Sequence, residues 1–362
     1  MINLKKSLVI ALCGTIIVSS LAGCKNSSTD KNSESPVSKE DLFPDHYTRS
    51  TDKVNFDIDL EVMDDFDPNN FTNAKVKGRT YTDVDKVYEL YVDGKDVSEV
   101  YETSPGDEGG INGKTYIMSD NEIVTAGTNF SMSTEKSYTY TRARRFSEKG
   151  ASKDEFDFAS STDCINDVKN ILESVDYDVT DVAFDWFSSS GEEYRLYEEE
   201  AIANETIESA KINQNSWSSD DNAYEIYGWQ TYKGLPVYPL IMTTRMTRCL
   251  ETYEKANVSA VCTKDGVLNI YASPLYDLKE TDKNIEFLSF EEIADSLVNR
   301  YENLLDENSY EVIRAKLALR IFYDEKGKYD SEPIWYFEVI DSNSNFEIVL
   351  YNAITGEEVY MP

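Results

Sequence analysis

The sequence predicts an α+β fold in which antiparallel sheets dominate and helices are few. Aromatic residues make up 12% of the chain, with 25 tyrosines, and such residues fit the pleated, half-buried surface of a strand. One helix followed by antiparallel strands occurs twice in the C-terminal half. With 362 residues and 40% hydrophobic content, the chain can build one or two domains with a real core.

The first 23 residues have the three zones of a lipoprotein signal peptide. Lys5 and Lys6 precede an apolar stretch, residues 8–18, which is too short to cross a bilayer as a permanent helix. Small residues then lead to a cysteine, whose thiol we expect to carry a diacylglyceryl group, since two acyl chains give stable attachment. The predicted signal-peptidase box consists of Leu21, Ala22, Gly23 and the lipidated Cys24.

Residues 24–53 are predicted to be a lipidated, disordered tether. They are rich in Ser, Asn, Asp, Lys and Glu, with Pro36 and Pro44, and cannot bury enough apolar surface to offset the entropy of ordering. Such a segment holds the folded part on the order of 30 Å from the lipid. The expected location is the extracytoplasmic face of the cell membrane, with membrane lipid as a partner through the diacylglyceryl anchor.

A small N-terminal α+β domain is predicted over residues 54–146. Residues 54–62 alternate apolar and polar side chains, as a half-buried strand does. A second strand is expected near 75–81, and Thr82 or Asp83 could cap a helix that ends at Asp93-Gly94. Residues 105–113 form a glycine-rich loop, and several short strands follow.

Residues 155–285 are predicted to form the first helix-plus-sheet half. Its helix begins near Asp163 and carries an apolar stripe. The strands are expected at 183–188, 194–199, 224–232 and 258–271, with Asp265-Gly266 as a hairpin turn.

Residues 286–362 repeat that plan. Ser289-Phe-Glu-Glu292 has the form of a capping box, in which each side chain satisfies an exposed backbone donor at the helix start. The strands are expected at 315–324, 333–340, 346–351 and 357–360.

The first half contains the short motifs Tyr232-Lys-Gly-Leu-Pro-Val237 and Lys264-Asp-Gly-Val-Leu268. The second half contains Ser289-Phe-Glu-Glu-Ile293, Pro333-Ile-Trp335 and Asn352-Ala-Ile-Thr-Gly-Glu357. In this order they resemble a tandem PepSY-like unit and the extracytoplasmic domains of the regulatory proteins YycH and YycI. The whole chain also resembles uncharacterised lipoproteins of Gram-positive (Firmicutes-type) anaerobes. The resemblance implies a non-enzymatic module that restrains or senses a partner.

Charge and histidine content exclude several classes of function. The formal net charge is −33, so a phosphate backbone would be repelled and nucleic acid is not an expected partner. His46 is the only histidine and lies in the predicted tether, which removes Ser-His-Asp and Cys-His catalysis and histidine-based zinc sites. We therefore expect no enzyme activity, no catalytic residue, no metal and no cofactor.

The five cysteines have different predicted fates. Cys13 leaves with the signal and Cys24 is lipidated, so Cys164, Cys249 and Cys262 stay in the folded part. Cys249 and Cys262 could form a disulfide between neighbouring strands in an oxidising compartment, although spacing alone does not fix that geometry. The alternative is that all three are small buried hydrophobic side chains.

Asp65, Asp67 and Asn69 have the alternate spacing of a calcium loop. Asn70 then stands where glycine is expected and Val76 where the bidentate glutamate is expected, so a polar turn is the better interpretation.

Arginines form two basic clusters that could receive an anion or an acidic partner. Pairing with the chain's own surplus carboxylates is the interpretation we favour. The clusters are Arg142, Arg144 and Arg145, and Arg245 and Arg248.

An aromatic-rich run between positions 217 and 238 supplies the candidate binding residues. Exposed aromatic faces beside carboxylates could stack on sugars or bind a peptide, whereas one side of a strand must face the core. The candidates are Trp217, Tyr227, Trp229 and Tyr232.

Two functional hypotheses follow. The first is a lipid-anchored interaction or regulatory module that contacts an envelope protein, by surface complementarity or by strand addition to a sheet edge. The alternative is a surface lipoprotein that binds a glycan or a peptide through the aromatic run.

Overall fold

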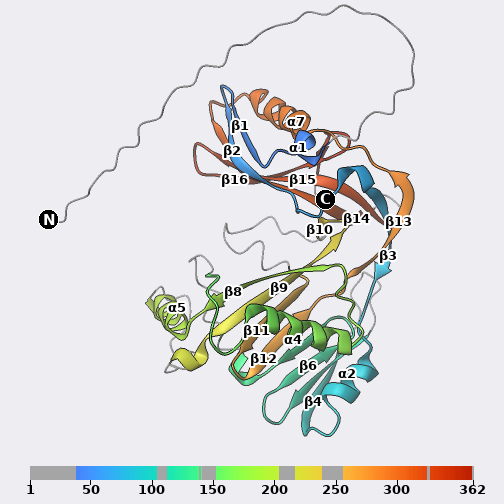
Figure 1. The fold of residues 1–362 in the computed structure, drawn as a ribbon, viewed down its shortest axis with the longest axis vertical. Helices are drawn as coiled ribbons and strands as arrows, with labels where there is room; N and C mark the ends of the chain where they lie inside the picture. The colour runs from blue at the N-terminus through green and yellow to red at the C-terminus, as the bar shows by residue number, and fades with distance from the viewer. Residues whose placement is uncertain are drawn as a thin grey trace, which may run out of the picture. The chain divides into compact units, whose positions relative to one another are not determined.

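The computed structural model describes residues 38–103, 112–137, 140, 152–203, 217–238, 256–323 and 327–360 (Figure 1). These residues have the predicted α+β fold: a 15-stranded mixed sheet and a separate two-stranded sheet carry the helices on their faces. The hydrophobic side chains divide into two large cores. We call the parts around them the α7 section and the α4 section, after the main helix of each.

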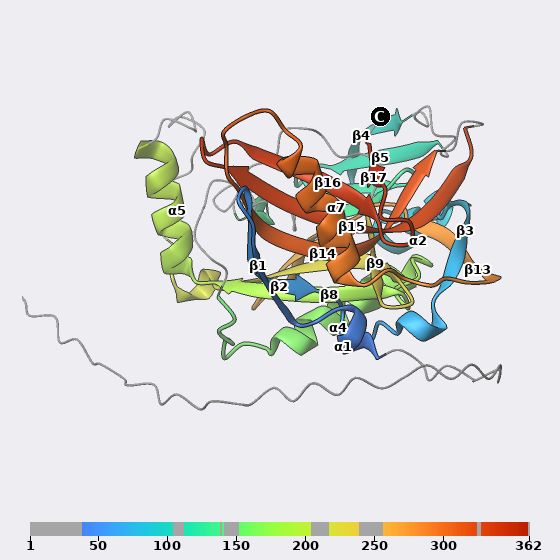
Figure 2. The same cartoon turned by 90° about the horizontal axis from the view of Figure 1, so that it is seen from above.

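The α7 section is built on the order β17-β16-β15-β14-β2-β1, in which β14 pairs antiparallel with β15 and parallel with β2. One long helix lies across this sheet (Figure 2). The elements are α1 (Lys39–Leu42), β1 (His46–Ser50), β2 (Val54–Glu61), α7 (Phe290–Glu302), β14 (Tyr310–Tyr323), β15 (Tyr329–Asp341), β16 (Phe346–Asn352) and β17 (Glu358–Val359).

The α4 section has the antiparallel order β8-β9-β11-β12-β7-β6-β5-β4. Two helices pack on its apolar face, and a third extends from its β8 end (Figure 1). The elements are α2 (Val84–Tyr91), β4 (Val97–Thr103), β5 (Gly113–Met118), β6 (Ile123–Ala126), β7 (Phe130–Ser133), α4 (Ser161–Ser174), β8 (Val182–Ser189), α5 (Gly191–Ala203), β9 (Ala223–Tyr232), β11 (Val258–Thr263) and β12 (Gly266–Ala272).

Within the described residues, two sets of strand pairings connect the sections. In the first, the β9–β10 hairpin leads from the α4 section to a parallel contact between β10 and β14. In the second, β3 and β13 pair antiparallel as a two-stranded sheet. The elements are η1 (Pro68–Asn70), β3 (Thr72–Arg79), η3 (Ser219–Asp221), β10 (Leu235–Tyr238) and β13 (Tyr276–Asn284).

A helix followed by a four-stranded antiparallel meander occurs three times in the described residues. The sequence predicted this order for α4 with β8, β9, β11 and β12, and for α7 with β14 to β17. The structure adds α2 with β4 to β7. In each case the helix covers the apolar face of its section, because its buried residues belong to the same core as the strands.

Several predicted elements are confirmed with their physical cause. Strand β2 alternates buried and exposed residues along its whole length, as its sequence pattern requires. Ser289 caps α7 with Glu292, and Ser160 caps α4 with Asp163, both as capping boxes. Asp83 caps α2.

The structure corrects the extent of the predicted tether, residues 24–53. Within that range α1 and β1 are ordered, because Phe43 and Tyr47 are buried in the α7 core. His46 therefore lies on β1 and not in a tether. Here the prediction rested on low apolar content, and two aromatic side chains are enough to bind this segment to the core.

The predicted domain over residues 54–146 is also corrected. Its first strand, β2, pairs with β14, its second, β3, pairs with β13, and β7 pairs with β12. The boundaries 155–285 and 286–362 are likewise crossed, since β10 pairs with β14 and β13 with β3. Residues distant in the sequence thus share each sheet.

Residues 194–199, predicted as a strand, belong to α5. Ser190 and Glu193 form reciprocal hydrogen bonds at its start, and Arg195 pairs with Glu192 and Glu199 one turn away on either side. The helix cap and the ion pairs at i,i+3 and i,i+4 stabilise a helical conformation of these residues relative to an extended one.

The single imidazole gives a direct test of the β1–β2 contact. His46 Nδ1 lies 2.7 Å from Asp59 Oδ1, and Nε2 lies 3.1 Å from Asp57 Oδ1. The hydrogen bond to Asp59 raises the pKa of His46 above the ordinary 6.5. The imidazolium therefore stabilises the folded state fully below the unfolded pKa, and that contribution is lost as pH rises through the folded pKa.

An NMR titration of the one imidazole signal should give a pKa above 6.5 in the folded chain. The variant with Asp59→Asn should lower it, while Asp45→Asn, at a carboxylate outside the two pairs, should leave it unchanged. A wild-type pKa at or below 6.5 would contradict the β1–β2 register.

The β9–β10 turn gives a second test. Lys233 and Gly234 both have positive φ, 48° and 79°, as the tight hairpin turn requires. A Cβ at Gly234 would lie 2.7 Å from backbone atoms of Phe66, whereas one at Gly266, also with positive φ, would meet nothing within 4 Å.

Gly266→Ala should therefore cost about 1 kcal/mol of unfolding free energy for its backbone conformation alone. Gly234→Ala should cost at least about twice as much, because the backbone near Phe66 must also move. Urea denaturation of both variants measures the difference, and equal losses would show that the close approach of the β9–β10 turn to Phe66 is not present.

Candidate functional site

Several predicted residues lie outside the described residues. The proposed lipidation and cleavage positions precede residue 38, and the basic clusters fall in the segments 141–151 and 239–255, so their roles stay predictions. In the part of the chain that the structure describes, no helix is both long enough and apolar enough to cross a membrane. The residues concerned are Leu21, Ala22, Gly23, Cys24, Arg142, Arg144, Arg145, Arg245, Arg248 and Cys249.

The predicted aromatic residues occupy three separate environments. Tyr232 is buried in the α7 core, with its ring 5.7 Å from that of Phe71. Trp217 stacks on Tyr194 at 5.0 Å, and its Nε1 donates a 2.8 Å hydrogen bond to Glu198. These two side chains therefore serve packing.

Tyr227 and Trp229 share one side of β9. Their rings stack at 6.3 Å, and Tyr227 also stacks on Phe187 of β8 at 5.2 Å. The Tyr227 hydroxyl donates to Glu225, a buried carboxylate that also accepts from Tyr194. The four candidates consequently do not form one continuous aromatic platform.

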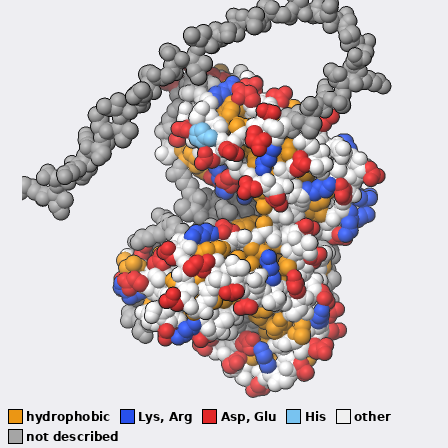
Figure 3. Space-filling model, in the orientation of Figure 1, with side chains coloured by type: hydrophobic (Ala, Val, Ile, Leu, Met, Phe, Trp, Pro, Cys, Tyr) orange, Lys and Arg blue, Asp and Glu red, His pale blue; other side chains and the backbone are white. Residues whose placement is uncertain are grey.

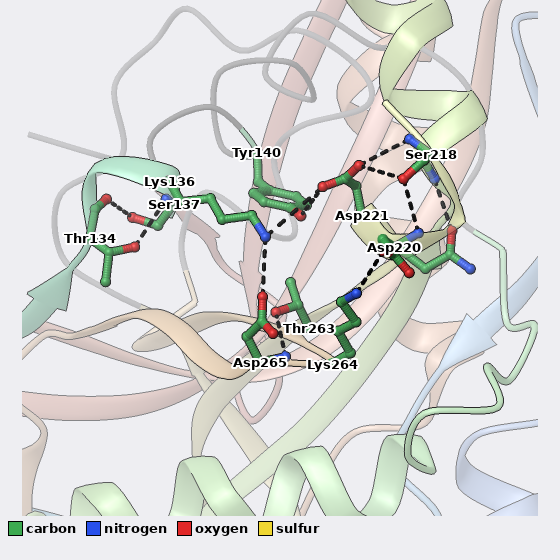
Figure 4. Close-up of polar contacts among 12 residues, drawn as sticks. Thr134, Lys136, Ser137, Tyr140, Ser218, Asp220, Asp221, Thr263, Lys264 and Asp265 are labelled. Carbon is green, nitrogen blue, oxygen red and sulfur yellow. Dashed lines mark hydrogen bonds and ion pairs between the residues drawn. The ribbon is translucent and has the colours of Figure 1, made fainter. Parts of the chain in front are cut away.

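A polar network lies where the end of β7, the helix η3 and the β11–β12 turn meet (Figure 4). Lys136 Nζ lies 3.2 Å from Asp265 Oδ2 and 4.0 Å from Asp221 Oδ1. Tyr140, which is almost fully buried, donates its hydroxyl to Asp221 at 3.4 Å. The network ties three segments together over an aromatic cluster that also contains Trp217.

The opposite charges of this network are paired. Lys264 Nζ lies 2.8 Å from Asp220 Oδ2, and the hydrogen bond from Lys264 holds the pKa of Asp220 below its usual value. In the described ranges no group of three or more His, Cys, Asp or Glu side chains is arranged to hold a metal ion. The arrangement can stabilise a turn, and it offers no pair of nucleophile and base.

The proposed calcium loop is a local cap. Asp67 accepts hydrogen bonds from the backbone N–H of Asn69 at 2.9 Å and from the side chain of Asn70, and so begins the short helix η1. These bonds hold the pKa of Asp67 below its usual value. The polar-turn interpretation of these residues agrees with the structure.

A second charged cluster joins β2 to β14. Arg314 contacts Glu61 with Nε and Nη2, at 2.5 and 2.8 Å, and contacts the buried Glu338 at 3.2 Å. Burial lowers the pKa of the neighbouring Lys316. Since the carboxylates are matched by cations and by the Tyr336 hydroxyl, this cluster fixes the parallel β2–β14 register.

One hollow on the surface of the α7 section is polar and open, with a volume of about 460 Å³. It lies at the β1–β2 turn, where Lys53 Nζ bonds the carbonyl oxygens of Leu304 and Asp306. Val54, Tyr310 and Ile340 are among its apolar contributors. Its cation, Lys53, is already bound to the chain itself, so the hollow offers little to an anionic ligand.

The remaining candidate is the free end of the α4 sheet. Strand β4 pairs with β5 and, among the strands described, with no other. Val100 and Tyr101 are each 52% exposed, and the nearby helix α2 exposes Tyr88 and Leu90. We call these four residues the β4–α2 patch; they are four of the ten large hydrophobic side chains that are exposed in the described residues.

On the side of Val100, the buried Tyr116 connects β4 to α2. Val100 stands opposite Tyr116 in the β4–β5 register, and the Tyr116 ring lies 5.4 Å from that of Tyr88. Tyr101 points to the other face of the strand because side chains alternate. Both faces of this edge therefore carry apolar surface beside backbone groups that no second described strand pairs.

Strand β4 was not predicted from the sequence, because residues 97–103 lie between a predicted helix end and a predicted loop. Their content of Val, Tyr and Thr favours a strand. The signal was weakened because polar and apolar residues do not alternate there, as befits a strand exposed along one edge.

No protein family and no curated protein matches the chain. Among solved structures, an uncharacterised protein from Eubacterium rectale is similar with a TM-score of 0.55 and 15% identity, over 88% of this chain and 94% of that one. The YpeB C-terminal domain of Bacillus megaterium matches with a TM-score of 0.28 and 12% identity, over 76% of this chain and 92% of that domain. The first similarity shows a common fold.

Neighbouring aspartates test the role of the network in Figure 4. Asp221→Ala should reduce the free energy of unfolding by about 1–2 kcal/mol, because it removes the partner of Ser218 in the η3 capping box and leaves the buried Tyr140 hydroxyl unpaired. Asp220→Ala, at a mostly exposed side chain, should have no measurable effect. Denaturation curves decide, and equal effects of the two substitutions would contradict the assignment.

Proposed function

We propose that this protein is a lipid-anchored, non-catalytic interaction module that binds an extended segment of an envelope protein at the edge strand β4. The lipidated Cys24 would hold it at the extracytoplasmic face of the cell membrane. The PepSY-like motifs and the repeated helix-and-meander plan support a regulatory module of this type, because they supply a scaffold and no reactive group.

The exposed edge of β4 is the observation that carries the proposal. Natural proteins protect sheet edges with charged side chains, proline, bulges or a covering element. Strand β4 has one register irregularity, between Val97 and Glu99, and pairs regularly with β5 beyond it. Residues 98–102 are exposed throughout, and Val100 and Tyr101 place apolar side chains on both faces of this edge. An added strand would gain main-chain hydrogen bonds and two apolar contacts at once.

Charge defines the chemistry of the partner. Asp85, Glu89, Glu99 and Glu102 are exposed around the β4–α2 patch, and acidic side chains are spread over the visible face of the molecule (Figure 3). The lysine on α2, Lys86, is paired with Asp176 at 2.6 Å. The segment that fits this edge is therefore extended and combines apolar residues with lysine or arginine.

The other edges are less suited to such a partner. Strand β17 is only two residues long, and its Glu358 is bound by Arg300. Strand β8 has its Ser188 N–H bonded to the carbonyl of Ser152. Strand β1 has no exposed large hydrophobic side chain.

Glycan or peptide binding through the aromatic run is the alternative, and it has weaker support. Trp217 and Tyr232 are engaged in packing, as described above. If this alternative holds, a panel of glycans and peptides should raise the melting temperature of the protein by ligand binding to the folded state.

Site-specific photo-crosslinking tests the proposal in native membranes. A photoreactive residue at Val100 of the full-length lipidated chain should capture one dominant protein, whereas the same residue at Leu305, which is fully exposed and outside the patch, should not. Sequencing of the crosslinked peptide should show an extended basic and apolar segment.

The double variant Val100→Lys, Tyr101→Lys should reduce capture by at least about tenfold, because edge lysines oppose strand addition. The variant Leu305→Lys is its matched control. Equal capture from positions 100 and 305, or full capture by the double lysine variant, would contradict the proposal.

A further inference from the structure

Two thiols are buried against each other in the α4 core. Cys164 and Cys262 are 1% and 2% exposed, and their Sγ atoms lie 2.8 Å apart. Both side chains are present as free cysteines in the structure. The third cysteine of the folded part, Cys249, lies outside the described residues.

The two cysteines come from different elements that the fold holds together. Cys164 lies in the first turn of α4, behind the Ser160 cap, and Cys262 lies on β11. Helix α4 lies across the strands that include β11 (Figure 1), and both side chains are part of one hydrophobic core. Their separation along the chain is 98 residues.

We propose that Cys164 and Cys262 are joined by a disulfide when the chain folds in an oxidising compartment. A disulfide bond is about 2.05 Å long, and the two sulfur atoms already lie in contact, so a small approach of the side chains is enough. In the cell this proposal rests on the extracytoplasmic location given above, whereas the test below does not.

The oxidation is a thiol–disulfide exchange. One cysteine thiolate attacks a disulfide oxidant such as oxidised glutathione, which forms a mixed disulfide and releases the first oxidant thiol. The second cysteine then attacks the cysteine sulfur of the mixed disulfide, which forms the Cys164–Cys262 bond and releases the second oxidant thiol. The two cysteines lose two protons and two electrons in total, and the oxidant disulfide is reduced to two thiols.

The order of events follows from burial. In the folded state the contact with Cys262, together with burial, raises the pKa of Cys164, which suppresses the reactive thiolate. Oxidation is therefore expected before α4 packs on the sheet, and the bond, once formed, is shielded from reductants. The crosslink would hold α4 on β11 across the segment that contains β8, α5 and β9.

Peptide mapping of the full chain, refolded with oxidised glutathione, is the test. Trypsin separates the three cysteines of the folded part, because Cys164, Cys249 and Cys262 fall in the tryptic peptides 154–169, 249–255 and 256–264. The expected product is a covalent pair of the peptides 154–169 and 256–264, which separates on reduction. A pair that contains the peptide 249–255, or three free thiols after refolding, would overturn the proposal.

Stability provides a second measurement. The oxidised chain should melt on the order of 5 °C above the reduced chain, and Cys249→Ser should keep this difference. Cys164→Ala and Cys262→Ala should each abolish it. Each variant is compared with itself in the presence and absence of reductant, so a general loss of packing cannot produce the difference in melting temperature. A difference in melting temperature that persists in Cys262→Ala would contradict the assigned pair.

Discussion

The two-sided pairing of β14 is the constraint on which the fold depends. This strand pairs with β15 along its whole length on one side, and on the other with β2 and then with β10, both in parallel. Parallel partners cannot be joined by a tight turn. The parallel partners of β14 therefore come from distant parts of the chain, β2 from its beginning and β10 from its middle. The α7 core, including the fully buried Trp335, cannot close until this late strand is in place.

The position of the candidate site follows from this arrangement. Because β10 continues from β9 into the contact with β14, the α4 section is attached through its β9 side, together with the β3–β13 pair. The meander β7-β6-β5-β4 extends away from that attachment and ends at β4. The strand with the exposed backbone is thus the one farthest along the sheet from β14, and a partner can approach it without disturbing either core.

Local signals in the sequence were sufficient for individual elements. The alternation in β2 and the capping serines of α4 and α7 act within a few residues, and the structure agrees with each. The strand predicted over residues 194–199 is wrong, because the reciprocal Ser190–Glu193 cap begins a helix there. The strand predicted over residues 224–232, which contains part of the aromatic run, is confirmed as β9. The distribution of the aromatic side chains among three environments depends on which faces those strands cover.

Long-range pairing could not be predicted in the same way. Nothing near Val54 indicates a parallel partner at Tyr310, and nothing near Cys164 indicates a contact with Cys262. The possible pair of Cys249 and Cys262 rests on the expectation that they lie on neighbouring strands, and Cys249 falls outside the described residues. Strand β4 is difficult to predict for a local reason. Residues 98–102 are exposed, so no buried face imposes an alternation of apolar and polar residues on its sequence.

Hydrogen exchange along the whole chain, compared between native membranes and the purified protein, tests the central claim most directly. The account predicts that amides of β4 exchange slowly in membranes and rapidly after purification, while the loop around Leu305 exchanges rapidly in both. Equal exchange of β4 in the two states, or protection concentrated instead around Trp217 and Asp221, would contradict the assignment of β4 as the binding edge.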